Sequence, residues 1–556
     1  MRHRLPAYAV AGLVVLFGAG ALAQAEAERQ LEAAIERLRA ALGSDATLTI
    51  GGRHVDPITG RATLTDVTIV ESTNRYTIAE VRLADLSEAR VGRAEFINPR
   101  HSATDSSGAA AQADRILIAG TPLPAPGNPP RWRTLSAEAV EVEALRIVAP
   151  GQGQIRLDRA SARDVRREGV GSGVVEGAEY TGMGADPQSF RLGRLTLEGV
   201  VLPLAGDDFD PLAFRAGRIA LENATLRDPG EQVRVSLGRL ALQDWNPGRL
   251  TSLAVENIAI AAPAKNYGAM EMSLVRIDSS GIDAARTLAA ALGGVQLPDP
   301  APGVPQRILF EGLDASLEGQ RVFTLGRFLT EGSLRDGMAS GALAAEDLRV
   351  MPPRGQAPWL EALGYQDVGG GIELRGTAPR AGGRLDISPL RISWTEALTL
   401  SVTAQVDGMP GAPPEGSQLN PEATLAQLAA GRLAGLTLSL RDHGLLGRVA
   451  AQQARQQRVP ESRIREQWVQ MAMAMPLPGT PHGRRGGPPP AAGKGGAAAD
   501  PLTSLRQAVA SFIRQPGTLE ITLRPPNPVS FAEVGTRAGG NPAEVIELLG
   551  LSATAR

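Results

Sequence analysis

The sequence predicts a mainly β protein: an elongated, curved antiparallel sheet of short strands, with an N-terminal helix and an α+β C-terminal region that contains helices. One observation behind this is a nine-residue cassette that recurs as RLTLEGVVL from Arg194, RIALENATL from Arg218 and SLAVENIAI from Ser252. Internal similarity of this kind is typical of adjacent strand units. The 556 residues also include 64 Gly and 41 Pro but only 4% aromatic residues, which favours frequent turns and thin aliphatic packing.

The apolar residues of the cassette stand at places 2, 4, 7 and 9, so the two-residue period of a strand slips once. The sixth place always holds Gly, Asn or Asp, the residues that best tolerate a left-handed backbone. We therefore predict a β-bulge or tight β-arc there, which keeps all four apolar places on one wall. The predicted left-handed positions are Gly199, Asn223 and Asn257 and, in the looser copies RLALQDWNP and RATLTDVTI, Asp244 and Asp66.

The predicted apolar wall is the candidate site of the chain. It consists of Leu195, Leu197, Val200, Leu202, Ile219, Leu221, Leu226, Leu240, Leu242, Leu253, Val255, Ile258 and Ile260. Two outcomes are open. Another sheet or helix could cover the wall as an ordinary core, or the wall could stay partly open as a groove for acyl chains.

The N-terminus has the three parts of a secretory signal: Arg2 and Arg4, an apolar run from Ala7, and a closing Ala21-Leu22-Ala23. It predicts an exported chain, with the segment either cleaved or retained as a membrane anchor. The expected location is the periplasm, with attachment to the inner membrane if the segment is retained as an anchor.

Composition shifts divide the chain into successive regions. The expected regions are 1–23, signal peptide or signal anchor; 24–44, helix; 45–300, cassette-built β region; 301–415, second β-meander region; and 416–556, an α+β region interrupted by a flexible linker at 476–499. Further helices are expected at 284–292, 359–363, 445–457 and 461–475, after Asp500 and after Asn541, and strands from Arg432 and at 518–523.

The sequence contains no pattern that points to catalysis. It has no Cys, which excludes disulfides and thiol nucleophiles, and its five His show no metal-ligand spacing. We expect no cofactor and no metal. The glycines of GVGSGVVEG, residues 169–177, miss the nucleotide-loop spacing and predict a flexible turn. The net charge of −2 argues against nucleic acid as a partner.

A basic helical stretch in the C-terminal region is open to two interpretations. It contains Arg448, Arg455, Arg458, Arg463 and Arg465, followed by Trp468. It is either a solvated helical face or a surface that binds anionic lipid headgroups.

The export segment, the many short apolar strands and the absence of a catalytic motif resemble the AsmA-like group of bacterial envelope proteins over residues 1 to 410. LRDHGLLGRVAAQQA from Leu440 and GTLEITLRPPNPVSF from Gly517 resemble the ends of uncharacterised exported alphaproteobacterial proteins. No residue role transfers from either resemblance. They imply a non-enzymatic envelope protein that binds or guides lipid or supports outer-membrane assembly. The alternative is a periplasmic scaffold that binds other envelope proteins.

Overall fold

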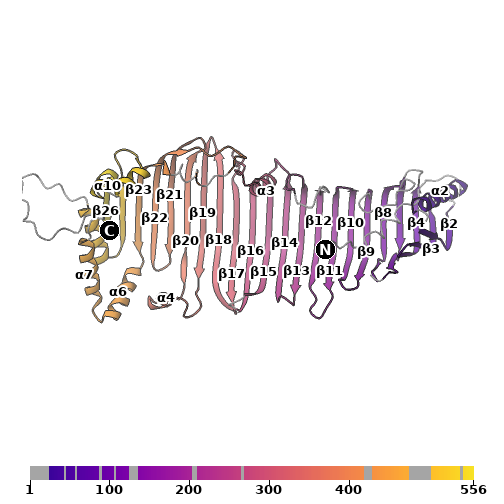
Figure 1. The fold of residues 1–556 in the computed structure, drawn as a ribbon, viewed down its shortest axis with the longest axis horizontal. Coiled ribbons are helices and arrows are strands. Elements are labelled where there is room, and N and C mark those ends of the chain that lie inside the picture. Colours follow the sequence, from indigo (N-terminus) through magenta and orange to yellow (C-terminus); the bar gives the residue numbers. More distant parts are fainter. Residues whose placement is uncertain are drawn as a thin grey trace, which may run out of the picture. The chain divides into compact units, whose positions relative to one another are not determined.

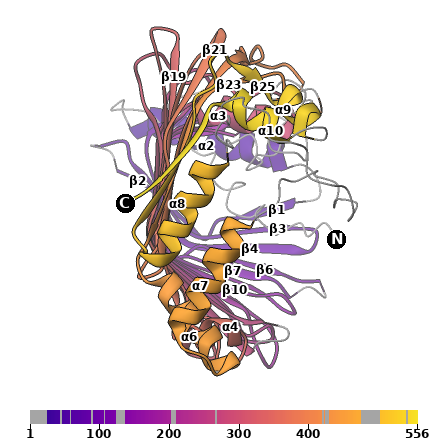
Figure 2. The same ribbon diagram turned by 90° about the vertical axis from the view of Figure 1, so that its left-hand side faces the viewer.

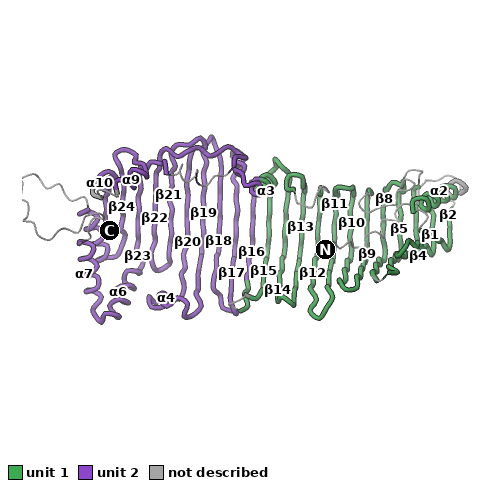
Figure 3. The backbone as a smooth tube through the Cα atoms, viewed as in Figure 1, with its two compact units in different colours: residues 1–271, 283–289 green, residues 272–282, 290–556 purple. Residues whose placement is uncertain are grey.

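The fold is that of a computed structural model. It describes residues 24–42, 46–56, 59–86, 90–105, 108–123, 136–202, 210–264, 268–418, 422, 429–474, 502–538 and 542–556. The predicted export segment at 1–23 and linker at 476–499 lie outside these residues. The chain forms two compact units, residues 1–271 with 283–289, and residues 272–282 with 290–556 (Figure 3).

Unit 1 is mainly antiparallel β structure, as predicted (Figure 1). Its elements are α2 (Gln24–Leu42), β1 (Ala46–Thr49), β2 (Gly52–Val55), β3 (Ala62–Glu71), β4 (Asn74–Leu86), β5 (Arg90–Ile97), β6 (Arg100–Ala103), β7 (Ala110–Gln112), β8 (Arg115–Pro122), β9 (Ala137–Ala149), β10 (Gly153–Arg166), β11 (Gly169–Gly182), β12 (Ser189–Val201), β13 (Ala216–Asp228), β14 (Val233–Trp245) and β15 (Thr251–Ala264). From β9 to β15 each strand pairs with the next along the chain. Before β9 the order is not sequential, since β4 pairs with β5 and β6, and β9 pairs with β7 and β8.

Unit 2 combines further antiparallel strands with the C-terminal helices. Its elements are β16 (Gly268–Ile282), α3 (Ala284–Leu292), β17 (Gln306–Leu317), β18 (Gln320–Arg335), β19 (Met338–Val350), α4 (Pro358–Ala362), β20 (Val368–Pro379), β21 (Gly382–Trp394), β22 (Leu398–Pro410), β23 (Arg432–Asp442), α6 (Leu445–Gln457), α7 (Glu461–Met473), α8 (Thr503–Arg514), β24 (Thr518–Leu523), β25 (Val529–Ser530), α9 (Phe531–Ala538), α10 (Pro542–Leu549) and β26 (Leu551–Ala555). The unit boundary divides β16 and α3. Figure 2 shows α6, α7 and α8 together at the C-terminal end of this unit.

The helices of the C-terminal region largely agree with the predictions. Helix α6 and strand β24 have the predicted bounds, and α7 ends two residues before the predicted Met475. Helix α9 and strands β25 and β26 were not predicted. Among the described residues, no helix combines the length and apolar composition that crossing a bilayer requires.

The left-handed backbone of the cassette is confirmed. The φ angles are 53° at Asp66, 58° at Gly199, 54° at Asn223, 55° at Asp244 and 56° at Asn257. From β9 to β15 these positions alternate between two lines across the sheet. One line holds the left-handed residues Ala144, Gly177, Asn223 and Asn257 of alternate strands, and the other holds Asp164, Gly199 and Asp244 of the strands between them.

The predicted bulge, however, is not formed, because no residue is inserted. Beside Asn257, Leu237 pairs with Ile258 and Arg239 pairs with Glu256, which is one uninterrupted register. The reason lies on the neighbouring strand, where Gly238 faces Asn257. A Cβ atom at Gly238 would lie 3.0 Å from the Asn257 Cβ, so the absence of a side chain leaves room for the left-handed residue in register.

The segment 169–177 is not the flexible turn that its glycines predict. It forms the first part of β11. Gly171 faces the left-handed Asp164, and a Cβ atom there would lie 2.8 Å from the Asp164 Cβ. The glycine content of this segment thus reflects close approach of neighbouring strands.

The main core of unit 1 lies between α2 and the first strands. Leu31, Ile35 and Leu38 recur at helical spacing on one face of α2 and are buried. They belong to one apolar cluster with buried residues of strands β2, β3, β4, β5, β8 and β9. The cassette copy in β3 is part of this cluster.

Candidate functional site: an aliphatic sheet face

The predicted wall residues meet in register across β12 to β15. Leu197, Ile219, Leu242 and Leu253 form one cross-strand row. Leu195, Leu221, Leu240 and Val255 form the next. Since directly opposed residues of neighbouring strands share a face, each row is a continuous aliphatic stripe.

Two more rows lie beyond the left-handed residues. Ile258 pairs with Leu237, and Ile260 pairs with Val235, which in turn pairs with Leu226. Val200 is buried opposite Val170 of β11. Leu202 is the exception, because it lies just beyond the end of β12 and is 53% exposed, so the structure does not place it in the wall.

The left-handed residue keeps the apolar places on one side of the sheet. The best evidence is the copy in β3, where Ala62, Leu64, Val67 and Ile69 all belong to one core although Asp66 interrupts them. In β12, Leu197 and Val200 likewise belong to one apolar cluster, although uninterrupted strand geometry would place them on opposite faces.

The degree of covering differs between copies of the cassette. In β3, Leu64 is 1% exposed and Ile69 is 3% exposed. In β12 to β15 most wall residues are half-buried, and Leu226 is 41% exposed. Helix α2 contributes to the cluster that buries the first copy, whereas the later copies retain access to solvent.

The opposite face of β9 to β15 carries alternating charges. One cross-strand row consists of Glu143, Arg159, Glu176, Arg194, Glu222, Arg239 and Glu256. Ion pairs of 3.2 Å join Arg194 to Glu176, and of 3.9 Å join Arg239 to Glu256. Arg194 and Arg239 stand at place 1 of the cassette, and Glu222 and Glu256 stand at place 5. Our prediction did not use the pairing of these two places. The row makes this face polar but nearly neutral.

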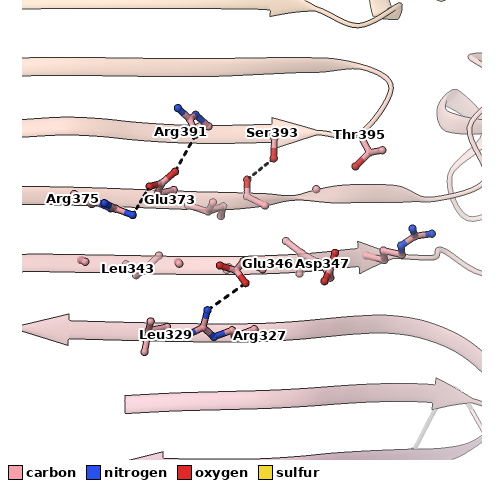
Figure 4. A pocket seen from close by; sticks show the side chains of 18 of the residues that line it. Arg327, Leu329, Leu343, Glu346, Asp347, Glu373, Arg375, Arg391, Ser393 and Thr395 are labelled. Atoms are coloured by element: carbon pink, nitrogen blue, oxygen red, sulfur yellow. Dashed lines mark hydrogen bonds and ion pairs between the residues drawn. The ribbon is translucent and has the colours of Figure 1, made fainter. Parts of the chain in front are cut away.

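Unit 2 contains a hollow of about 740 Å³ over strands β18 to β21 (Figure 4). Several of its charges are paired with one another: Arg327 with Glu346 at 3.6 Å, and Glu373 with Arg375 and Arg391, each at 3.1 Å. Because four arginines and four carboxylates line the hollow, it offers little net charge to a ligand.

A buried polar group lies at the edge of the unit 1 core. The His101 ring stacks on Tyr76 with centroids 4.9 Å apart, and its Nε2 lies 2.9 Å from the Asn74 Oδ1. Burial lowers the pKa of His101 and raises the pKa of Tyr76 to about 12. A neutral imidazole and a protonated phenol fit a packing role in the core.

Other predicted features give no further site. Among the described residues, no group of three or more His, Cys, Asp or Glu side chains could hold a metal ion. Part of the basic stretch is engaged within the protein. Arg448 pairs with Glu396 at 3.2 Å and lies 4.3 Å from the ring centroid of Tyr365, and Arg455 donates a hydrogen bond to the Ala362 carbonyl.

Comparison with known proteins adds a similarity at the C-terminal end. Residues 391–556, from within β21 onward, match the model of a family described as "Uncharacterized protein". No curated protein matches the chain. The aliphatic face of β12 to β15 lies outside the matched residues, so its role has to be argued from its own geometry.

Proposed function

We propose that this chain is an exported, non-enzymatic envelope protein of the periplasm that binds or guides lipid, and so supports outer-membrane assembly. One observation carries the proposal. The apolar places of the cassette are buried in β3, in a core to which α2 contributes, and they recur in β12 to β15 as aligned aliphatic rows that remain mostly half-buried.

The chemistry of these rows suits acyl chains. They consist of Leu, Ile, Val and Ala with few aromatic residues, so they offer dispersion contacts but no directed hydrogen bonds. Strands lie about 4.8 Å apart, so a row across four strands is roughly 14 Å long. Contiguous exposed apolar surface of this kind marks binding sites in soluble proteins.

Native mass spectrometry and lipid extraction of the purified chain test the proposal. Leu226→Gln with Ile260→Gln places two polar groups in one aliphatic row, on either side of Val235. The matched control is Thr225→Gln with Ala259→Gln, which changes the adjacent residues of the same strands on the opposite face. We expect bound phospholipid in the wild type and the control, and its loss in the first variant.

The proposal fails if no lipid accompanies the wild type, or if both variants lose lipid equally. Crosslinking in cells provides a second test of the proposed function. Protein partners recovered through this face in place of lipid would favour the scaffold function.

A further inference from the structure

The polar face of unit 1 gathers arginines around one hollow without a carboxylate among them. There Arg75 of β4, Arg100 of β6 and Arg146 of β9 line a hollow of about 430 Å³. The other side chains around it include Thr77, Ser102 and Gln112, and no Asp or Glu lines it.

The pairing of non-sequential strands brings these residues together. Arg100 pairs with Thr77 on one side and with Gln112 on the other, and Gln112 pairs with Arg146. Arg75 pairs with Ser102, two residues along the same strands. Strand periodicity therefore places all three guanidinium groups on one face, opposite the side on which His101 is buried.

Three carboxylates on strands β5 and β9 of the same unit are already engaged with another arginine. Arg115 pairs with Glu95, with Glu141 at 3.3 Å and with Glu143 at 3.1 Å. Among the ion pairs of the described residues, none involves the three arginines of the hollow, and Arg146 donates one hydrogen bond, of 3.2 Å, to the Gln154 side chain. Like charges gathered without counter-charges attract an anion.

We propose that this hollow binds a phosphate group, either free or as the headgroup of a larger molecule. Guanidinium groups present paired N–H donors that match phosphate oxygens, and the Thr77 and Ser102 hydroxyls and the Gln112 amide supply further donors. The site goes beyond the proposed function, because it uses the polar face of unit 1, opposite the aliphatic rows.

Titration calorimetry with inorganic phosphate, and sedimentation with phosphatidylglycerol vesicles against phosphatidylcholine vesicles, test this site. The variant is Arg100→Gln with Arg146→Gln. The matched control, Arg159→Gln with Arg194→Gln, removes the same charge from the paired row of the same face. We expect the first variant to weaken binding by about tenfold or more, and the control by less than about threefold.

Binding of inorganic phosphate without vesicle binding identifies a site for small phosphates. Selective binding of phosphatidylglycerol vesicles identifies a headgroup site. Equal weakening in the two variants, or no binding of either probe, overturns the proposal. In native mass spectrometry, the Arg100→Gln, Arg146→Gln variant should retain its bound lipid, because its aliphatic face is unchanged. This measurement distinguishes failure of the phosphate site from failure of the proposed lipid function.

Discussion

Two copies of one cassette in unit 1 differ in how far their apolar residues are buried. In residues 61–69 the apolar places are buried in a core to which α2 contributes, and in residues 252–260 the corresponding places are mostly half-buried in a broad sheet face. The backbone device is the same, with φ near 55° at both Asp66 and Asn257. The cassette therefore builds an aliphatic surface, and a separate element decides whether that surface becomes a core.

The largest expected effect is a loss of unfolding free energy at the leucine of place 4, which should differ between the buried copy and the half-buried copy. Leu64→Ala should lower the free energy of unfolding of its region by about 2–5 kcal/mol, because it opens a cavity in a closed core. Leu197→Ala should cost less than half as much, since that side chain is only half-buried. Hydrogen exchange of β3 and β12 under increasing denaturant measures both. Equal losses would mean that the later copies are covered in solution.

The next prediction concerns the backbone that both copies share. Asp66→Val and Asn257→Val should each cost about 1–3 kcal/mol, because a β-branched residue is strained in the left-handed region. Because this strain is local, the two costs should be similar despite the different burial. Thermal unfolding measures the loss, with Asp66→Gly and Asn257→Gly as controls that should change little. A neutral valine variant at either position would contradict the left-handed assignment.

The smallest expected effect is a response to pH that only the covered region should show. Burial holds the pKa of His101 below its unfolded value of 6.5. The unfolded state therefore takes up the proton first, and stability is full above about pH 6.5 and falls as the pH drops below it, by at most about 1.4 kcal/mol per unit.

Hydrogen exchange at pH 7.5 and 5.5, corrected for intrinsic rates, should show this loss in β4 to β9 but not in β12 to β15, which contain no histidine. His101→Phe, which keeps a ring against Tyr76, should flatten the response. An unchanged response in that variant would assign the titration to another group.

The left-handed positions could be predicted because Gly, Asn and Asp at the sixth place carry a local signal that requires no knowledge of the neighbours. Ala144 adopts the same conformation with a φ of 52° and carries no such signal. The glycine that faces most of the left-handed residues, such as Gly238 opposite Asn257, could not be identified because it belongs to another strand. Without that partner, a bulge was the natural expectation.

The aliphatic wall could be predicted from the periodicity of the cassette, but the copies that are covered could not. Leu64 and Leu197 occupy the same place in similar cassettes, but Leu64 belongs to a closed core that includes residues of α2, and Leu197 does not. The arginine hollow was also beyond prediction. Arg75, Arg100 and Arg146 are far apart in sequence, and they meet because β6 and β7 are inserted between β4 and β9.

The alternation of left-handed residues between two lines constrains how such a chain can change length. Each strand from β11 to β14 holds one left-handed residue and faces those of its neighbours with a glycine. Adding or deleting one strand would place two strands of the same direction next to each other, and it would disturb both lines of left-handed residues. A whole hairpin preserves them. The modular unit of growth by duplication is therefore the strand pair, and variation in length among related chains should come in hairpin steps.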